Sequence, residues 1–318
     1  MAVLYIAAAL LALLLLGGYL GFRYAFARTP DPDWDDPVSL ANSMWKNHPM
    51  DIPAANQWLR DHGAEDVEAR SFDGLRLRGK WVPAKHPIGT IILFHGYRSS
   101  YLTDFGGIFQ TYHDLGLNLL LVRQRAHGES EGKYITFGVH ERKDVLSWIA
   151  FHNLTHGADN VFLGGMSMGA STVLFAAGED LPENVRGITA DCGFTSPAEI
   201  IGKVAQSSFH LPAKFAAALL NIYTRVLAGF SLYECDTRQT LKQAKVPILM
   251  IHGKADDFVP CWMSQAGFNA CASEKQLFLA ENAGHGMSYL LEKKRLTATL
   301  IDFFKSHISP RYQLEETK

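Results

Sequence analysis

A serine between two glycines is the first group in this sequence that could do covalent chemistry. Residues 165–169 read Gly-Met-Ser-Met-Gly, with Ser167 at the centre. An apolar run at 160–163 precedes this segment, and a helix-compatible stretch at 170–177 follows it. That order predicts a tight strand-to-helix turn, on which the glycines relieve crowding and the helix N-terminus favours developing negative charge. We therefore predict that Ser167 is a nucleophile.

A serine hydroxyl needs a base, and the base needs a carboxylate to orient it. His285 follows the apolar run 276–279 and has glycines on both sides, which favours an accessible imidazole. Asp256 and Asp257 follow the apolar run 247–251. Adjacent residues on a loop point in different directions, so only one of these two carboxylates can face His285.

Backbone N–H groups suit the negative oxygen of a tetrahedral intermediate, because they are fixed in place and already aimed. Met168, directly after the nucleophile, is expected to supply one of them. The second is expected from the loop at 95–100, which follows the apolar run 90–94, and we assign it to the N–H of Tyr97. The side chains of Tyr97 and Arg98 are equally compatible with merely shaping the mouth of the site.

Six segments, taken together, resemble the motifs of the bacterial α/β-hydrolase family that includes the serine aminopeptidase and prolyl-oligopeptidase-like hydrolases. They are HGYRSS (95–100), RQRAHGESEG (123–132), GGMSMG (164–169), DCGFTS (191–196), HGKADDFVP (252–260) and AGHG (283–286). The resemblance covers about 60–310. It implies the α/β-hydrolase fold and a catalytic triad of Ser167, Asp256 and His285, with Asp256 rather than Asp257 as the acid.

One segment departs from the family's pattern. Arg123 stands where an aspartate is usual, in the stretch Arg-Gln-Arg-Ala-His-Gly-Glu-Ser at 123–130. That stretch forms a structural loop in the family and carries no member of the triad. The change puts a local salt-bridge pattern in doubt, and we interpret His127 as a structural residue.

The elements that position these residues are predicted from hydrophobic patterning. Several runs are almost wholly apolar rather than alternating, as a sheet covered on both faces requires. We expect strands at 75–82, 90–94, 118–122, 160–163, 187–190, 247–251 and 276–279, and helices at 104–115, 141–152, 168–178, 262–272 and 288–305. The fold class is therefore α/β, with a mostly parallel, doubly wound sheet whose carboxyl ends carry the site. Residues 197–240 break the alternation and predict a short helical lid inserted between two strands.

The N-terminal segment has the length and composition of a membrane span. Residues 3–22 carry no charge, and at about 1.5 Å per residue a helix of that length crosses a bilayer core of about 30 Å. The alternative is a secreted protein whose signal peptide is cleaved at Ala-Phe-Ala (25–27), although no cation precedes the apolar run. Arg23 and Arg28 directly follow the span, which favours a single-pass protein with its catalytic domain in the cytoplasm.

The chain thus divides into a transmembrane anchor and its flank at 1–28, a linker at 29–38 and a hydrolase domain at 39–318. The linker assignment rests on three prolines and four acids, which disfavour helix and strand.

Composition limits the partners. Thirty Lys plus Arg against 32 Asp plus Glu give a net charge of −2, so no global field attracts nucleic acid. The four cysteines are too few and too scattered for a disulfide scaffold or a metal site, and we expect them to be reduced and mostly buried. Neither a metal nor an organic cofactor is expected.

These features predict acyl transfer to water through an acyl-enzyme on Ser167. The expected small-molecule substrate is a carboxylic ester, and the membrane anchor favours an ester derived from a lipid. A peptidase or amidase of the same fold is the alternative within the same chemistry. A non-catalytic, membrane-bound scaffold is the alternative from another class. Neither the acyl-chain length nor the oligomeric state follows from the residues.

Overall fold

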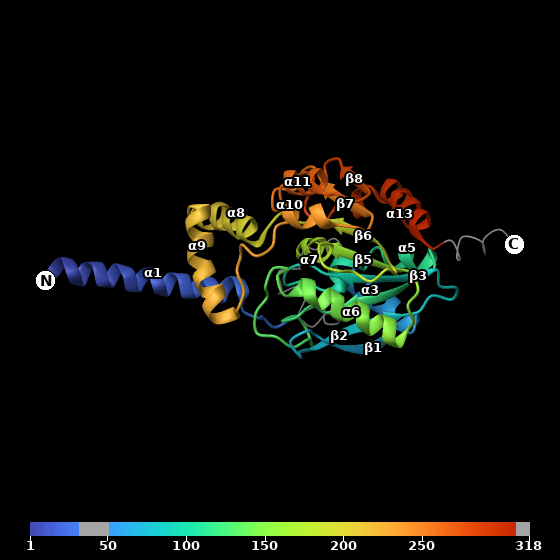
Figure 1. The fold of residues 1–318 in the computed structure, drawn as a ribbon, viewed down its shortest axis with the longest axis horizontal. Coiled ribbons are helices and arrows are strands. Elements are labelled where there is room, and N and C mark those ends of the chain that lie inside the picture. The colour runs from blue at the N-terminus through green and yellow to red at the C-terminus, as the bar shows by residue number, and fades with distance from the viewer. Residues whose placement is uncertain (32–50, 310–318) are drawn as a thin grey trace.

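The computed structural model describes residues 1–31 and 51–309, which form an eight-stranded sheet with helices on both faces (Figure 1). The strand order is β1-β2-β4-β3-β5-β6-β7-β8. Only the pairs β1–β2 and β2–β4 are antiparallel among the described strands. The strands are β1 (Glu65–Arg70), β2 (Arg76–Val82), β3 (Gly89–Phe94), β4 (Leu117–Val122), β5 (Val161–Met166), β6 (Val185–Asp191), β7 (Ile248–Gly253) and β8 (Lys275–Ala280). The predicted mostly parallel, doubly wound sheet is confirmed.

The sheet is buried on both faces because side chains alternate along each strand. In β3, Ile91 and Leu93 join the core under one helical layer, and Ile92 and Phe94 join the core under the other. The first layer contains α3 (Ile52–Asp61), α4 (Tyr101–Phe105), α5 (Phe109–Asp114), α12 (Ser288–Leu291) and α13 (Lys293–His307). The second contains α6 (Glu141–Thr155), α7 (Met168–Ala176), α10 (Thr237–Thr240) and α11 (Trp262–Ala270).

Several predicted elements need correction. The helix expected at 104–115 is two short helices, α4 and α5, separated at Gly106 and Gly107, and the one expected at 288–305 is broken at Glu292. Strand β1 and helix α3 were not predicted at all. The proposed linker at 29–38 and the domain start at 39 lie largely outside the described residues.

The predicted lid, residues 197–240, leaves the sheet after β6 and returns to it at β7. It contains α8 (Pro197–Phe209), α9 (Ala213–Tyr223), a π-helical turn (Thr224–Ala228) and α10. Ser196 caps α8 by accepting the N–H of Glu199, and Pro197 occupies the first helical position. Figure 1 shows α8 and α9 at the end of the molecule from which the N-terminal helix projects.

The N-terminal helix α1 (Ala2–Phe26) has two different halves. Among the described residues it is the one helix long and apolar enough to cross a membrane. Its first part projects from the molecule, with large apolar side chains exposed (Figure 1). Its last turns are built into the domain, where Phe22 and Phe26 are fully buried in a cluster that includes Met168, Phe137 and Phe230. The helix therefore extends one turn past the predicted end of the span at 22.

Candidate active site

Ser167 lies on a strained turn between β5 and α7. Its backbone has φ 55° and ψ −115°, an unusual conformation for a residue with a side chain. The neighbouring glycines explain how the turn closes. A Cβ on Gly165 would lie 2.3 Å from the carbonyl oxygen of Gly169, and a Cβ on Gly169 would lie 1.8 Å from that of Phe94. The Gly-x-Ser-x-Gly spacing is thus required by the close approach of three backbones.

The structure brings Ser167, His285 and Asp256 into one hydrogen-bonded chain. His285 Nε2 is 2.9 Å from Ser167 Oγ, and His285 Nδ1 is 2.7 Å from Asp256 Oδ2. Because a carboxylate can only accept at Nδ1, the imidazole carries its proton there and leaves Nε2 free to accept from the hydroxyl. The three residues come from the carboxyl ends of β5, β7 and β8, as predicted from their place after apolar runs.

Asp256 is held as a carboxylate by donors on several sides. The backbone N–H groups of Phe258 and Val259 donate to its Oδ1 at 3.0 and 2.8 Å. His252 Nε2 lies 3.3 Å from Oδ2. Burial acts to raise the pKa of Asp256, but hydrogen bonds from His252 and His285 outweigh it and hold the pKa well below its usual range. Asp257, the alternative acid, is exposed.

His252 is a contributor that the sequence analysis missed. Its side chain is fully buried, with Nδ1 2.7 Å from Ser264 Oγ and Nε2 2.8 Å from the carbonyl oxygen of Val259. These contacts fix the ring beside Asp256. Its position within the motif at 252–260 was a signal for such a role.

The two residues assigned to the oxyanion hole flank Ser167. Met168 is the first residue of α7, so its N–H has no acceptor within the helix. Tyr97 lines the cavity at Ser167, in a loop so close that a Cβ on Gly96 would lie 3.3 Å from the Ser167 Cβ. This places both assigned residues beside the nucleophile.

The loop at 95–100, which carries Tyr97, is fixed in position by a residue that the sequence did not reveal. The half-buried Asp104 accepts the N–H of Gly96 at 2.6 Å and the hydroxyl of Ser99 at 2.5 Å. Burial raises the pKa of Asp104, and these hydrogen bonds favour its ionised form. Asp104 is therefore a positioning residue for the loop that carries Tyr97.

Two buried histidines hold the same loop from the side. His127 Nε2 accepts the N–H of Arg98 at 3.0 Å, and its Nδ1 donates to the carbonyl of Arg125 at 2.9 Å. His95 Nδ1 lies 2.8 Å from the carbonyl oxygen of Gly96. Burial lowers the pKa of both His95 and His127, which keeps both rings neutral. The structural interpretation of His127 agrees with these contacts.

The side chains of Tyr97 and Arg98 form hydrogen bonds with the end of α1. The Tyr97 hydroxyl donates to the carbonyl of Ala25 at 2.9 Å, and Arg98 donates to the carbonyl of Tyr24 at 2.5 Å. Burial raises the pKa of Tyr97 to about 12, so the phenol stays protonated and can donate. These contacts satisfy carbonyl groups that the last turn of a helix leaves without partners. The apolar N-terminal helix is thereby connected to the oxyanion loop.

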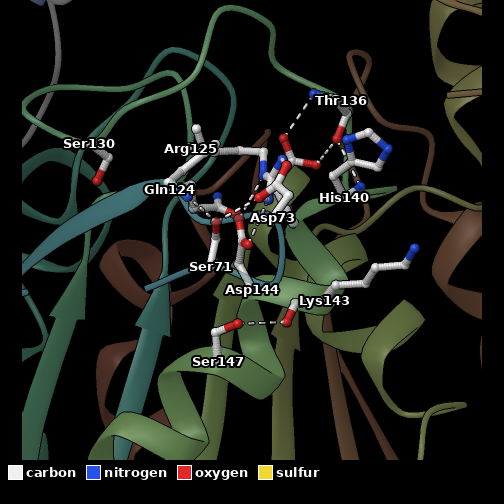
Figure 2. Close-up of polar contacts among 12 residues, drawn as sticks. Ser71, Asp73, Gln124, Arg125, Ser130, Thr136, His140, Lys143, Asp144 and Ser147 are labelled. Atoms are coloured by element: carbon white, nitrogen blue, oxygen red, sulfur yellow. Dashed lines mark hydrogen bonds and ion pairs between the residues drawn. The ribbon is translucent and has the colours of Figure 1, made fainter. Parts of the chain in front are cut away.

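The loop at 123–130 carries a second cluster of buried charges (Figure 2). Arg125 donates two hydrogen bonds of 2.7 Å to Asp144, and both side chains are 4% exposed. The same guanidinium contacts both carboxylate oxygens of Asp73 at 3.0 and 3.1 Å. Arg123, the departure from the family pattern, lies 3.3 Å from Asp31. A different ion pair therefore stands at the altered position.

A cavity of about 470 Å³ opens beside Ser167 and His285. It extends under α4 and α5 towards α13, and most of its lining is apolar. Its wall residues include Phe105, Ile108, Met166, Met287, Leu296 and Leu300. Polar groups also reach it, notably Asp191, for which burial raises the pKa to about 6. Its size is that of a small-molecule site.

One group of potential metal ligands lies at the same place. The ligand atoms of Cys192, Asp256 and His285 fall within 4.8 Å of one another. However, Asp256 and His285 are already bonded to each other, and burial raises the pKa of the Cys192 thiol well above its usual value. The ligand atoms of Asp256 and His285 are thus engaged with each other and with Ser167, so this group does not fit a metal. Cys192, Cys235 and Cys271 are buried and Cys261 is half-buried, all as free thiols.

Comparisons with known proteins are consistent with this architecture. A family model described as the alpha/beta hydrolase fold matches residues 89–245. The uncharacterised protein YqkD of Bacillus subtilis (strain 168) is 27% identical over 231 residues, which cover 72% of this chain and 75% of YqkD.

Solved structures give the same result. The Pyrococcus furiosus esterase Pf2001 is similar with a TM-score of 0.64 and 21% identity, over 79% of this chain and 96% of the esterase. The Pyrococcus horikoshii acylaminoacyl peptidase is similar with a TM-score of 0.58 and 17% identity, over 77% of this chain and 41% of the peptidase. At such identities the likeness shows the fold alone.

Proposed function

We propose, from the premise that this chain is an α/β-hydrolase-fold protein, that it is a serine hydrolase cleaving carboxylic esters through an acyl-enzyme on Ser167. One observation carries the proposal: the unbroken chain of hydrogen bonds from Ser167 through His285 to Asp256. This chain of hydrogen bonds ends at Ser167, which lines a cavity rather than the hydrophobic core. An activated hydroxyl that faces a small-molecule cavity is the arrangement that acyl transfer requires.

In the proposed reaction, Ser167 Oγ attacks the ester carbonyl while His285 Nε2 takes the hydroxyl proton. Asp256 stabilises the imidazolium through the Nδ1–H bond. The carbonyl oxygen becomes negative and accepts from the N–H groups of Tyr97 and Met168. The imidazolium then gives its proton to the departing alcohol. A water molecule, deprotonated by His285 Nε2, attacks the acyl-enzyme. The bond between the acyl carbon and Ser167 Oγ then breaks, the imidazolium returns the proton to Ser167 Oγ, and the carboxylic acid is released. These steps need neither a metal nor an organic cofactor.

The apolar cavity supports an ester of a small or medium acyl group as the substrate. An amide would follow the same steps, because the attacking and stabilising groups are unchanged, so a peptidase or amidase differs from an esterase only in its leaving group. A non-catalytic scaffold would have no need of the strained Ser167 turn or of the donors around Asp256.

We also propose that α1 is a retained, single-pass membrane anchor and not a cleaved signal peptide. Cleavage at Ala-Phe-Ala (25–27) would require Phe26, which is fully buried, to leave the core. It would also separate Tyr97 from the Ala25 carbonyl. The positions of Arg23 and Arg28 after the span favour a cytoplasmic catalytic domain. A membrane location makes lipid-derived esters attractive substrates.

A fluorophosphonate probe tests the catalytic proposal. The full chain should be labelled at Ser167, and Ser167→Ala should abolish labelling and lower ester turnover by about 10⁶-fold. Correctly folded protein that is not labelled would refute the proposal. A panel of p-nitrophenyl esters of increasing chain length, with matched p-nitroanilides, then separates an esterase from an amidase. Activity on the anilides alone would favour the peptidase alternative.

A further inference from the structure

The outer side of the lid carries a row of exposed apolar side chains. Leu211, Phe215, Ile222 and Val226 are 46%, 48%, 57% and 76% exposed. Phe215 and Ile222 lie seven residues apart on one side of α9, Leu211 directly precedes that helix, and Val226 follows it in the π-helical turn. Exposed apolar side chains gathered in this way mark an interaction surface rather than ordinary scatter.

The row is not a consequence of a missing core, because the opposite side of the same helix is packed. Ala216 and Ala217 of α9 are buried within the domain. The charges of the segment have one sign: Lys214 and Arg225 are exposed, and residues 210–229 contain no Asp or Glu. An amphipathic helix with cations beside an apolar face is typical of segments that lie in the interface of an anionic membrane.

The contact between α9 and α1 fixes the depth of this surface. A Cβ on Gly18 would lie 2.6 Å from the ring of Tyr223, so the two helices touch closely there. The Tyr223 hydroxyl donates to the carbonyl of Leu15 at 2.6 Å. Figure 1 shows α9 crossing the base of α1, from which the remainder of α1 projects. The residues of α1 before this crossing are therefore those up to 14.

That projecting part is too short to span a bilayer by itself. Residues 2–14 extend about 20 Å at about 1.5 Å per residue, against a hydrocarbon core of about 30 Å. The uncharged segment reaches the required length only when its last two turns, at 15–22, are also immersed. Because α9 crosses α1 at those turns, α9 must then enter the boundary between headgroups and acyl chains.

We propose that the outer row of the lid, formed by Leu211, Phe215, Ile222 and Val226, is a membrane-contacting surface whose partner is the interface of an anionic phospholipid bilayer. This inference rests on the proposed membrane anchoring by α1. Lys214 and Arg225 lie where phosphate groups would be. The lid therefore rests on the membrane, and the end of the domain that carries Ser167 faces the lipid surface.

Depth-dependent quenching of single fluorophores tests the proposal on the full chain in vesicles of phosphatidylcholine and phosphatidylglycerol. Cys261→Ser removes the half-buried native thiol, and a nitrobenzoxadiazole label is then attached to Ile222→Cys or Val226→Cys. Leu154→Cys is the matched control, because Leu154 is an apolar residue, 86% exposed, in the last turn of α6, where the nearby His152 lies 2.9 Å from Thr90 at the amino end of β3, the end of the sheet away from Ser167. Leu10→Cys reports the anchor itself. Fluorophosphonate labelling verifies that each variant is folded.

A label at Ile222 or Val226 should lose about half of its emission or more to lipids with shallow nitroxides, as expected at a depth of about 5–10 Å. A label at Leu10 should be quenched by deep nitroxides, and a label at Leu154 by neither. If Ile222 and Val226 behave as Leu154 does while Leu10 is quenched, the anchor stands and the lid surface is refuted. If Leu10 is not quenched either, both the anchor and the lid surface are refuted. Neither result affects the proposed chemistry of Ser167.

Discussion

The clusters around Arg125 and around His285 both contain buried charged groups, but their hydrogen-bond networks end at different kinds of group. Arg125 is enclosed by Asp144 and Asp73, so that its donors point at fixed carboxylates of the protein itself (Figure 2). The chain from Asp256 through His285 ends on Ser167 Oγ, which faces a cavity. A closed network stabilises a loop, whereas an open one leaves a reactive group available to a ligand. The comparison teaches that burial of charge alone does not mark a catalytic site.

The largest effect is expected from breaking the open cluster at its acid. Asp256→Asn keeps the size of the side chain but removes the charge that holds the imidazolium and selects the tautomer. Ester turnover should fall about 10⁴-fold, and the free energy of unfolding should fall as well, because the lowered pKa means that the carboxylate stabilises the fold. Steady-state kinetics on a p-nitrophenyl ester measure the loss. Asp257→Asn is the matched control, and an equal loss in that variant would contradict the assignment of the acid.

Breaking the closed cluster should affect stability instead. Arg125→Met leaves Asp144 buried without its guanidinium, which should lower the free energy of unfolding by about 3–5 kcal/mol. Chemical denaturation of the detergent-solubilised protein measures this loss. Turnover per fluorophosphonate-labelled molecule should stay within a few-fold of the natural chain. The double variant Arg125→Met/Asp144→Leu should recover part of the stability, and a failure of turnover with intact folding would assign Arg125 to the chemistry.

Asp191 is a carboxyl that lines the cavity and whose burial is expected to affect stability. Burial raises its pKa to about 6. An exposed aspartate has a pKa of about 3.9, so the folded chain binds this proton more tightly, and stability falls as the pH rises from about 4 to about 6. The difference of about two pKa units corresponds to about 3 kcal/mol. The free energy of unfolding of Asp191→Asn, taken relative to that of the natural chain, should therefore be higher at pH 8 than at pH 4 by up to that amount. An equal difference in unfolding free energy at both pH values would contradict the raised pKa.

The smallest effect is expected from the hydrogen bond between Tyr97, which lines the cavity at Ser167, and the end of α1. Tyr97→Phe keeps the backbone N–H and removes the hydrogen bond to the Ala25 carbonyl. We expect a loss of about 1 kcal/mol, seen as a roughly fivefold lower kcat with little change in KM. Tyr223→Phe is the matched control, since it removes a similar bond to the Leu15 carbonyl away from the site. Equal effects of the two variants on kcat would show that Tyr97 has a purely structural role.

Much of the proposed site could be predicted from the sequence because its residues follow apolar runs. Ser167, Asp256 and His285 each stand just after a buried strand, and parallel strands bring their carboxyl ends together. No motif marked Asp104, and His252 lay within a motif that did not specify its role, because both act on other residues rather than on a substrate. Their roles depend on which backbone groups lie nearby, and that is a property of the folded loop.

The fold was predictable to the same degree and for the same reason. Strands β3 and β7 are almost wholly apolar, whereas β1 reads Glu-Asp-Val-Glu-Ala-Arg and lies at the exposed edge of the sheet, where nothing enforces burial. The break between α4 and α5 falls at paired glycines, which weaken a helix. The docking of α1 onto the lid was not predictable, because the same uncharged residues that suit a membrane also pack against Tyr223 and Leu219.

The hydrogen bond from Tyr97 to the Ala25 carbonyl joins two parts of the chain that are synthesised at different times. Residue 25 leaves the ribosome about 200 residues before Tyr223, an interval of roughly 10–40 s at 5–20 residues per second. Phe22 packs against Tyr134 and Phe26 against Phe137, so both side chains lack these partners until about 110 further residues have been made. The loop at 95–100 gains the contacts of Tyr97 and Arg98 with α1 only when the domain folds against the end of that helix. On the proposed anchoring and chemistry, the helix therefore reaches the membrane before the domain that it contacts is complete.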